Sequence, residues 1–200
     1  MWAGSGVGAK VVPGSYIVRL IEDKTIIAEA AVEIKLDPRV TTSDADLKEQ
    51  FDLHQKVNKK VDEAHIAINQ LRKIRTQING YMATVKDTVA VNQMKKMTKS
   101  TLENLDKIES SLMQPKAKAP QDVLAYPIQL NDKMAGLGSN ISSSESKPTR
   151  NAYFVYEDLA MKIDAEIKKI KDIVDKDVKE FNAFVMKQQI PAIILDKEIK

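Results

Sequence analysis

Cysteine is absent from the 200 residues of this chain, and aromatic side chains make up only 5% of it. Without cysteine the chain can form no disulfide bond, no thiolate metal site and no cysteine nucleophile. The scarcity of aromatic residues favours aliphatic helix packing over the core of a β-sandwich. No uninterrupted apolar run approaches the roughly 20 residues of a membrane-spanning helix, so we expect no membrane span.

A large excess of charge of one sign is also missing. The chain has 31 basic and 28 acidic residues, for a formal net charge of +3. A dedicated nucleic-acid binder carries a larger basic excess, so we expect no nucleic-acid partner. With 43% apolar and 30% charged residues, the composition is that of a folded chain rather than a disordered one. Residues 1–6 lack the basic and apolar regions of a signal peptide, and we expect the chain to be cut from a longer protein.

Two long segments carry apolar residues in steps of three and four, which places those residues on one face of a helix. The first stripe consists of Val57, Val61, Ala64, Ile68, Leu71, Arg75 and Ile78. The second consists of Tyr153, Tyr156, Ala160, Ile163, Ile167, Ile170, Val174 and Phe181. Each stripe needs a partner surface, so the pattern predicts helices packed on helices.

Capping and helix-breaking residues set the limits of these helices. Ser43 and Asp46 have the spacing of a capping box, and Gly80 is a typical C-terminal stop. Thr149 is the expected cap of the last helix, which Pro191 ends before an apolar tail. The apolar stripe of the second helix is less regular near Val91-Asn92, which leaves open whether the helix breaks there. The expected helices span about 44–79, 82–113, 127–136 and 149–188, with a polar flexible loop over 138–147.

The N-terminal part of the chain predicts a β-hairpin. Residues 15–21 and 25–36 have the composition of strands and flank a short turn at 22–24. Tyr16, Val18 and Leu20 alternate with Ile17, Arg19 and Ile21, so both faces carry apolar side chains. A lone hairpin is marginal in water, so these strands either pack on the helices or belong to a larger sheet. Without such a cover, we expect the chain to self-associate through residues 15–36, with a homodimer as one form.

The sequence therefore predicts a mainly α chain. Residues 40–200 are expected to form an antiparallel bundle of three to four long helices. Residues 1–39 are expected to form a β-hairpin that is a fragment of a small β-sandwich.

Few residues suggest a catalytic or metal site. His54 and His65 share one helix face, but they are eleven positions apart, which is roughly 16 Å along the helix axis and too far for one metal ion. Asp172 and Asp175 lie in a charge-rich segment typical of solvated carboxylates rather than of a catalytic acid pair. We therefore expect no catalytic, cofactor-binding or metal-binding residues and no enzymatic activity of this chain.

Several short motifs occur in an order and spacing that resemble one protein family. They are Val12-Pro13-Gly14-Ser15-Tyr16-Ile17-Val18-Arg19-Leu20, Asp37-Pro38-Arg39, Leu71-Arg72-Lys73-Ile74-Arg75-Thr76-Gln77-Ile78, Tyr126-Pro127 with Leu130-Asn131, Pro148-Thr149 and Phe181-Asn182. With these motifs the chain resembles the C-terminal region of large bacterial sortilin-type β-propeller proteins, labelled BNR-repeat or glycosyl-hydrolase-like. The resemblance covers nearly the whole chain.

The resemblance implies a parent protein with a propeller first, a small β-sandwich next and a helical region last. Any glycosidase activity would belong to the propeller, whose Asp-box, Ser-x-Asp-x-Gly-x-Thr-Trp, has no copy here. The chain would then be a non-catalytic C-terminal accessory module. Its partners would be the propeller and sandwich of an exported protein in the periplasm, on the cell surface or outside the cell. Two alternatives remain: part of a glycoside hydrolase whose catalytic propeller is absent from this chain, and an independent coiled-coil interaction protein.

Overall fold

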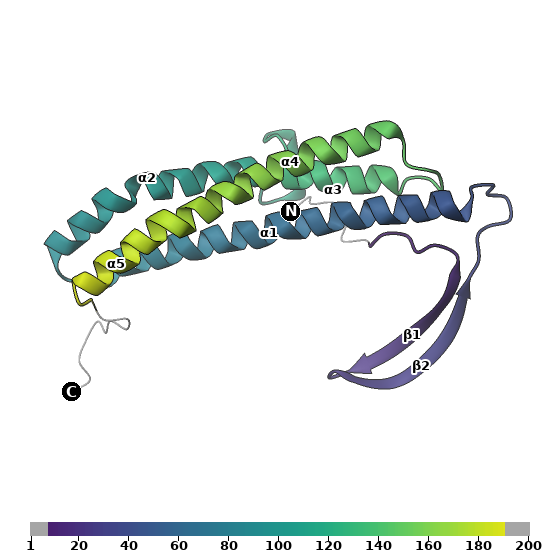
Figure 1. The fold of residues 1–200 in the computed structure, drawn as a ribbon, viewed down its shortest axis with the longest axis horizontal. Coiled ribbons are helices and arrows are strands. Elements are labelled where there is room, and N and C mark those ends of the chain that lie inside the picture. The colour runs from purple at the N-terminus through teal and green to yellow at the C-terminus, as the bar shows by residue number, and fades with distance from the viewer. Residues whose placement is uncertain (1–7, 191–200) are drawn as a thin grey trace.

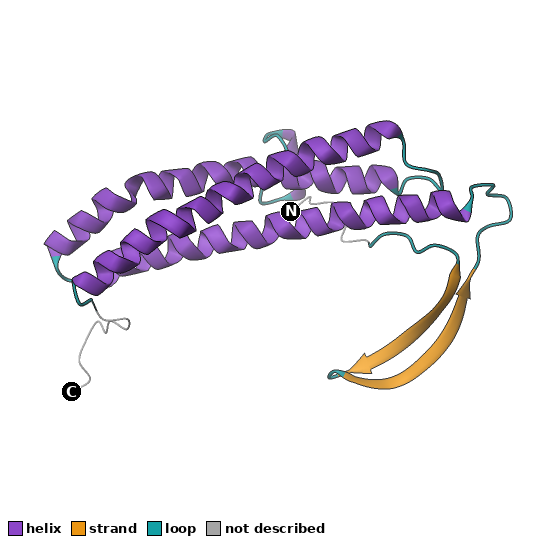
Figure 2. Ribbon diagram, in the orientation of Figure 1, coloured by secondary structure: helices purple, strands orange, loops and turns teal. Residues whose placement is uncertain are grey.

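The computed structural model describes residues 8–190. An elongated helical bundle follows a β-hairpin that projects from one end of it (Figure 1). Most of the described residues are helical, and the two strands among them form the hairpin (Figure 2). The architecture predicted from the sequence, a helical bundle preceded by a hairpin, is therefore confirmed. The expected helix stop at Pro191 and the apolar tail after it lie outside the described residues.

Three rods of helix lie side by side in the bundle, and each rod packs against the other two. The first rod is α1 (Asp44–Thr84). The second is interrupted and runs back along it as α2 (Thr88–Leu112) and α3 (Leu130–Ile141). The third consists of α4 (Arg150–Ile173), a π-helical turn (Val174–Val178) and α5 (Lys179–Lys187). At 1.5 Å per residue, α1 is roughly 60 Å long and spans the whole bundle.

The predicted stripes form the core of the bundle. On α1, the stripe residues Val57, Ala64, Ile68, Leu71 and Ile78 are at most 4% exposed. On the third rod the buried residues are Ile163, Ile170 and Phe181 from the stripe, together with Leu159 and Ile173 from outside it. The stripe residues Tyr153, Tyr156, Ala160, Ile167 and Val174 are half-buried at its margin.

Side chains cap three of the helices. The Ser43 hydroxyl accepts a hydrogen bond from the backbone N–H of Asp46 at 3.1 Å. The Thr149 hydroxyl accepts one from the N–H of Ala152 at 3.2 Å. Both caps were expected from the sequence and are confirmed. Asp87 caps α2 in the same way, with 2.9 Å to the N–H of Val89.

The predicted end of the first helix at Gly80 is wrong, because α1 continues to Thr84. Tyr81 and Met82, which follow the glycine, pack on the apolar cluster at this end of the bundle. That packing offsets the modest cost of a glycine inside a helix. The chain turns at residues 85–87, and α2 is continuous beyond them, so the helix does not break near Val91-Asn92.

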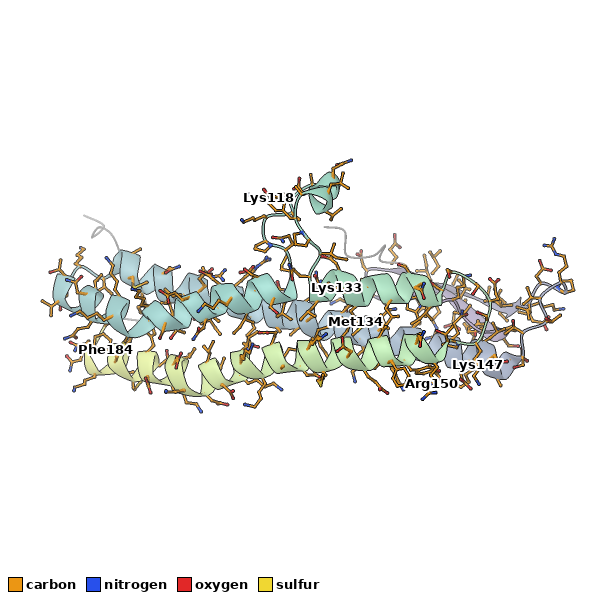
Figure 3. All side chains as sticks on the ribbon, turned by 90° about the horizontal axis from the view of Figure 1, so that it is seen from above. Lys118, Lys133, Met134, Lys147, Arg150 and Phe184 are labelled. Atoms are coloured by element: carbon orange, nitrogen blue, oxygen red, sulfur yellow. The ribbon has the colours of Figure 1, made fainter. Side chains whose placement is uncertain are left out.

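The segment between α2 and α3 differs most from expectation. A 3₁₀ turn (Pro120–Leu124) forms there, because the Asp122 carboxylate accepts the backbone N–H groups of Lys118 and Ala119. The segment stands out from the side of the bundle, as the position of Lys118 in Figure 3 shows. Helix α3 begins at Leu130 rather than at Pro127, and it continues to Ile141. The loop predicted over 138–147 therefore begins only after Ile141, and the last helix ends at Lys187.

Candidate interaction surface

The candidate functional site is the β-hairpin, built from β1 (Gly14–Glu22) and β2 (Thr25–Ile34). A two-residue turn joins the antiparallel strands, and its residues Asp23 and Lys24 have positive φ angles of 44° and 70°. Such mirror-image turns match the right-handed twist of a hairpin. Gly14 is the first residue of β1 and has a φ of 154°, a backbone conformation that residues other than glycine rarely adopt.

The strand register gives the hairpin two unlike faces. Residues directly opposite each other share a face, and the register pairs Tyr16 with Val32, Val18 with Ala30 and Leu20 with Ala28. Gly14 and Ile34 form the next pair on the same side. We call this surface the apolar face; its side chains are those of Tyr16, Val18, Leu20, Ala28, Ala30, Val32 and Ile34.

The opposite face is mixed in polarity. Arg19 lies opposite Glu29, and its Nε donates to the carboxylate Oε1 at 2.6 Å. Ser15 lies opposite Glu33, and Ile17 opposite Ala31. Ile21 lies opposite Ile26 on this face, and Ile17, Ile21 and Ile26 are 62%, 57% and 48% exposed, so the face combines an ion pair with exposed isoleucines.

Within residues 8–190, no helix covers the apolar face. Val18, Leu20 and Val32 are 57%, 60% and 40% exposed, although each is a large aliphatic residue. The strands contact each other extensively, and no helix packs on either of them to a similar degree. Neither of the two apolar clusters of the bundle includes a strand residue. Of the two sequence-based alternatives, packing on the chain's own helices is therefore excluded for the described residues.

The base of the hairpin is attached to the bundle by a few polar contacts. Lys10 forms an ion pair with Glu145 at 3.0 Å, and Thr42 donates to the backbone carbonyl of Glu145 at 2.6 Å. A hollow of about 280 Å³ lies between the hairpin base and the start of α1, lined by side chains that include Val12, Ile34 and Leu47. These contacts hold the base of the hairpin against the bundle. The rest of the two strands makes no such contacts with the described helices.

The two histidines singled out in the sequence lie apart, between α1 and α3. His54 is buried against Gly138, and burial lowers the pKa of its imidazole below the usual range. His65 lies 3.5 Å from the side-chain nitrogen of Asn131. Across residues 8–190, no three histidine or carboxylate side chains come together as metal ligands would.

The carboxylates considered as an acid pair make separate surface ion pairs. Asp172 contacts Lys168 at 2.7 Å, and Asp175 contacts Lys179 at 3.0 Å. Both are i,i+4 pairs on exposed helix surface, where such pairs add a few tenths of a kcal/mol, roughly 0.3–0.5, to stability.

Burial raises the pKa of Asp132, and the nearby His65 opposes that shift. Asp132 lies in the first turn of α3, beside the buried Asn131. A small hollow of about 10 Å³ next to these two residues has room for about one water molecule.

The sequence identified half of the candidate surface. Tyr16, Val18 and Leu20 were recognised as one face from their alternation. The matching residues of β2, Ala28, Ala30 and Val32, were missed because their face depends on the register. The signal that finds them is the two-residue turn, which fixes Glu22 opposite Thr25.

Comparison of the chain with protein-family models, with curated proteins and with solved structures gave no match. Within the described residues, no helix combines the length and apolar character needed to cross a membrane.

Proposed function

We propose that this chain is a non-catalytic structural and interaction module, in which the helical bundle presents the β-hairpin to a partner protein. The observation that carries the proposal is the apolar face of the hairpin, which stays exposed along both strands. Contiguous apolar surface of this kind marks a protein interaction site. Docking to a partner would bury the apolar side chains of the hairpin, which the helices of the bundle do not cover.

The helical bundle supports this proposal because its apolar core is formed by helices alone. Its main apolar cluster joins residues of α1, α2, α3 and α4, and it contains no residue of the hairpin. Lys60 of α1 adds a polar link to α4, with 2.8 Å from its Nζ to Asp164. Because the bundle does not need the strands for its core, the hairpin is free to be buried against another surface.

The wider setting proposed here follows from the resemblance to sortilin-type propeller proteins. We propose that the module is the C-terminal part of a larger exported β-propeller protein, whose propeller and sandwich are its partners. The coding sequence upstream of residue 1 tests this setting. In-frame Asp-box repeats, Ser-x-Asp-x-Gly-x-Thr-Trp, would support it, whereas a stop codon directly upstream would contradict it.

The non-catalytic role is tested by an assay on a panel of aryl glycosides and polysaccharides. We expect no turnover by the purified chain, because its carboxylates in charge-rich segments are engaged in surface ion pairs such as Lys168–Asp172. Turnover that persists through purification and disappears when one carboxylate is replaced by its amide would contradict the proposal.

A further inference from the structure

We propose that the end of the bundle opposite the base of the hairpin docks on a membrane surface that contains anionic lipid. At this end α1 turns into α2 and α5 closes the third rod (Figure 1). We call the docking surface the basic end; its exposed side chains are those of Lys86, Val89, Lys95, Lys96, Lys99 and Met186. The basic end is a second interaction surface, independent of the hairpin.

The basic end results from an uneven distribution of charge along the chain. Residues 64–102 contain seven lysines and arginines but one acidic residue, Asp87, although the whole chain is nearly balanced. Two of the seven are arginines that pair with Glu109, and the other five are lysines. In the third rod, residues 174–187 carry three acidic and three basic residues, which do not offset the excess. This end of the bundle is therefore positively charged.

Three of the lysines lie on one exposed face of α2. Successive residues of a helix are about 100° apart, so Lys95, Lys96 and Lys99 fall within an arc of about 100°. The opposite face of the helix is buried, since Ala90 and Met94 are 3% and 0% exposed. The three ammonium groups therefore point away from the core of the bundle and are available to an anionic surface.

These lysines lack the local partners that stabilise lysines elsewhere on the helices. Exposed lysines such as Lys48 form i,i+4 ion pairs with aspartates. Lys95 and Lys96 have no acidic residue three or four positions away, and each has Lys99 at that spacing instead. Lys99 has Glu103 four positions on, but the two form no ion pair in the described structure. Like charges at these spacings repel, and an anionic partner would relieve that repulsion.

Exposed apolar side chains at the same end favour a lipid surface over a soluble polyanion. Val89 in the first turn of α2 is 65% exposed, and Met186 near the end of α5 is 78% exposed. The two helices meet here in one apolar cluster, which includes Phe184, labelled in Figure 3. Anionic bilayers attract lysines near their surface, and apolar side chains insert at the boundary between headgroups and acyl chains. A soluble polyanion would contact the lysines and leave Val89 and Met186 in water.

Co-sedimentation of the full chain with vesicles tests the proposal. One kind of vesicle contains phosphatidylcholine alone, and the other also contains about 30% phosphatidylserine. We expect several-fold more protein on the anionic vesicles at about 0.1 M salt and a large loss of binding at about 0.5 M salt, because salt screens exposed charges. Equal binding to both kinds of vesicle, or no binding to either, would overturn the proposal.

Two matched double variants test the lysines. Lys95→Gln with Lys96→Gln removes two unpaired charges, and Lys162→Gln with Lys168→Gln removes two charges from ion-paired lysines. The first should weaken binding at least about tenfold, since each lysine near an anionic surface contributes roughly fivefold. The second should weaken binding much less. The first should also melt at or slightly above the wild-type temperature, because it relieves like-charge repulsion. An equal loss of binding in both would contradict the assignment.

A further pair of double variants tests the apolar side chains. Val89→Ser with Met186→Ser should reduce vesicle binding several-fold. Ile66→Ser with Met161→Ser, at positions that are 66% and 65% exposed elsewhere on the bundle, should not. If Val89→Ser with Met186→Ser has no effect and inorganic polyphosphate displaces the protein from the vesicles, the partner is a soluble polyanion rather than a lipid surface. A loss of vesicle binding in Val18→Ser would place the contact on the hairpin and would also overturn the proposal.

Discussion

At the residue scale, a buried carboxylate explains why an arginine occupies the apolar stripe of α1. The Glu109 side chain of α2 is only 9% exposed, and its two oxygens contact Arg72 Nε at 2.6 Å and Arg75 Nη1 at 2.7 Å. Burial alone would raise the pKa of Glu109, but the hydrogen bonds from both guanidinium groups outweigh it and hold the pKa below its usual range. Arg75 is thus the partner that makes a buried charge tolerable between α1 and α2.

This lowered pKa predicts a pH-dependent loss of stability in Glu109→Gln. A carboxylate with a lowered folded-state pKa stabilises the fold above its unfolded pKa, about 4.3, and loses that contribution as pH falls through the folded value. We expect the variant to lose about 1.5–3 kcal/mol at pH 7 and much less at pH 3, measured by urea unfolding. Asp106→Asn is the control, because Asp106 contacts Arg75 but is 68% exposed. An equal loss for Glu109→Gln at both pH values would contradict the assignment.

Close packing at Gly138 predicts opposite effects of two alanine substitutions in α3. A Cβ at Gly138 would lie 3.0 Å from His54 Nε2 and 3.2 Å from Val57 Cγ1, whereas a Cβ at Gly136 has open space. Alanine in place of helical glycine is otherwise worth about 0.5–1 kcal/mol. We expect Gly136→Ala to raise the melting temperature and Gly138→Ala to lower it. Equal stabilisation by both would mean that α1 and α3 are not in close contact there.

At the element scale, the continuity of α1 through Gly80 gives a direct prediction. Gly80 has a helical rather than a left-handed conformation and open space around its Cα. Gly80→Ala should therefore stabilise the chain by about 0.5–1 kcal/mol in thermal unfolding. If the helix instead ended at Gly80 with a left-handed cap, alanine would be strained and the variant would be less stable.

The elements show where sequence reasoning succeeds and where it stops. The apolar stripes and the caps at Ser43 and Thr149 are local signals, so they predicted the bundle and two helix starts correctly. The π-helical turn at Val174–Val178 has no such signal. A π-helical turn contains an extra residue, which changes the helical phase of the residues after it. The buried residues on either side of this turn are Ile173 and Phe181. Asp177 in this turn accepts a hydrogen bond from Thr101 of α2 at 2.8 Å, a contact between distant segments that periodicity cannot reveal.

At the scale of the whole molecule, residues 8–190 form a bundle with its own apolar core and a hairpin that no described helix covers. The sequence predicted both parts and the apolar character of β1. It left open whether the strands pack on the helices, because that depends on tertiary placement rather than on local pattern. In the described structure the strands leave the end of the bundle where α1 begins and curve back below it (Figure 1).

Native-state amide hydrogen exchange tests this division most directly, measured by mass spectrometry on the monomeric chain. Elements with few buried contacts open at low free energy, and core helices open only with global unfolding. We expect amides of β1 and β2 to exchange at least about a hundredfold faster than those of α1 between Ala64 and Leu71. Protection of the hairpin equal to that of the α1 core would show that the strands are covered by their own chain, and it would contradict the central claim.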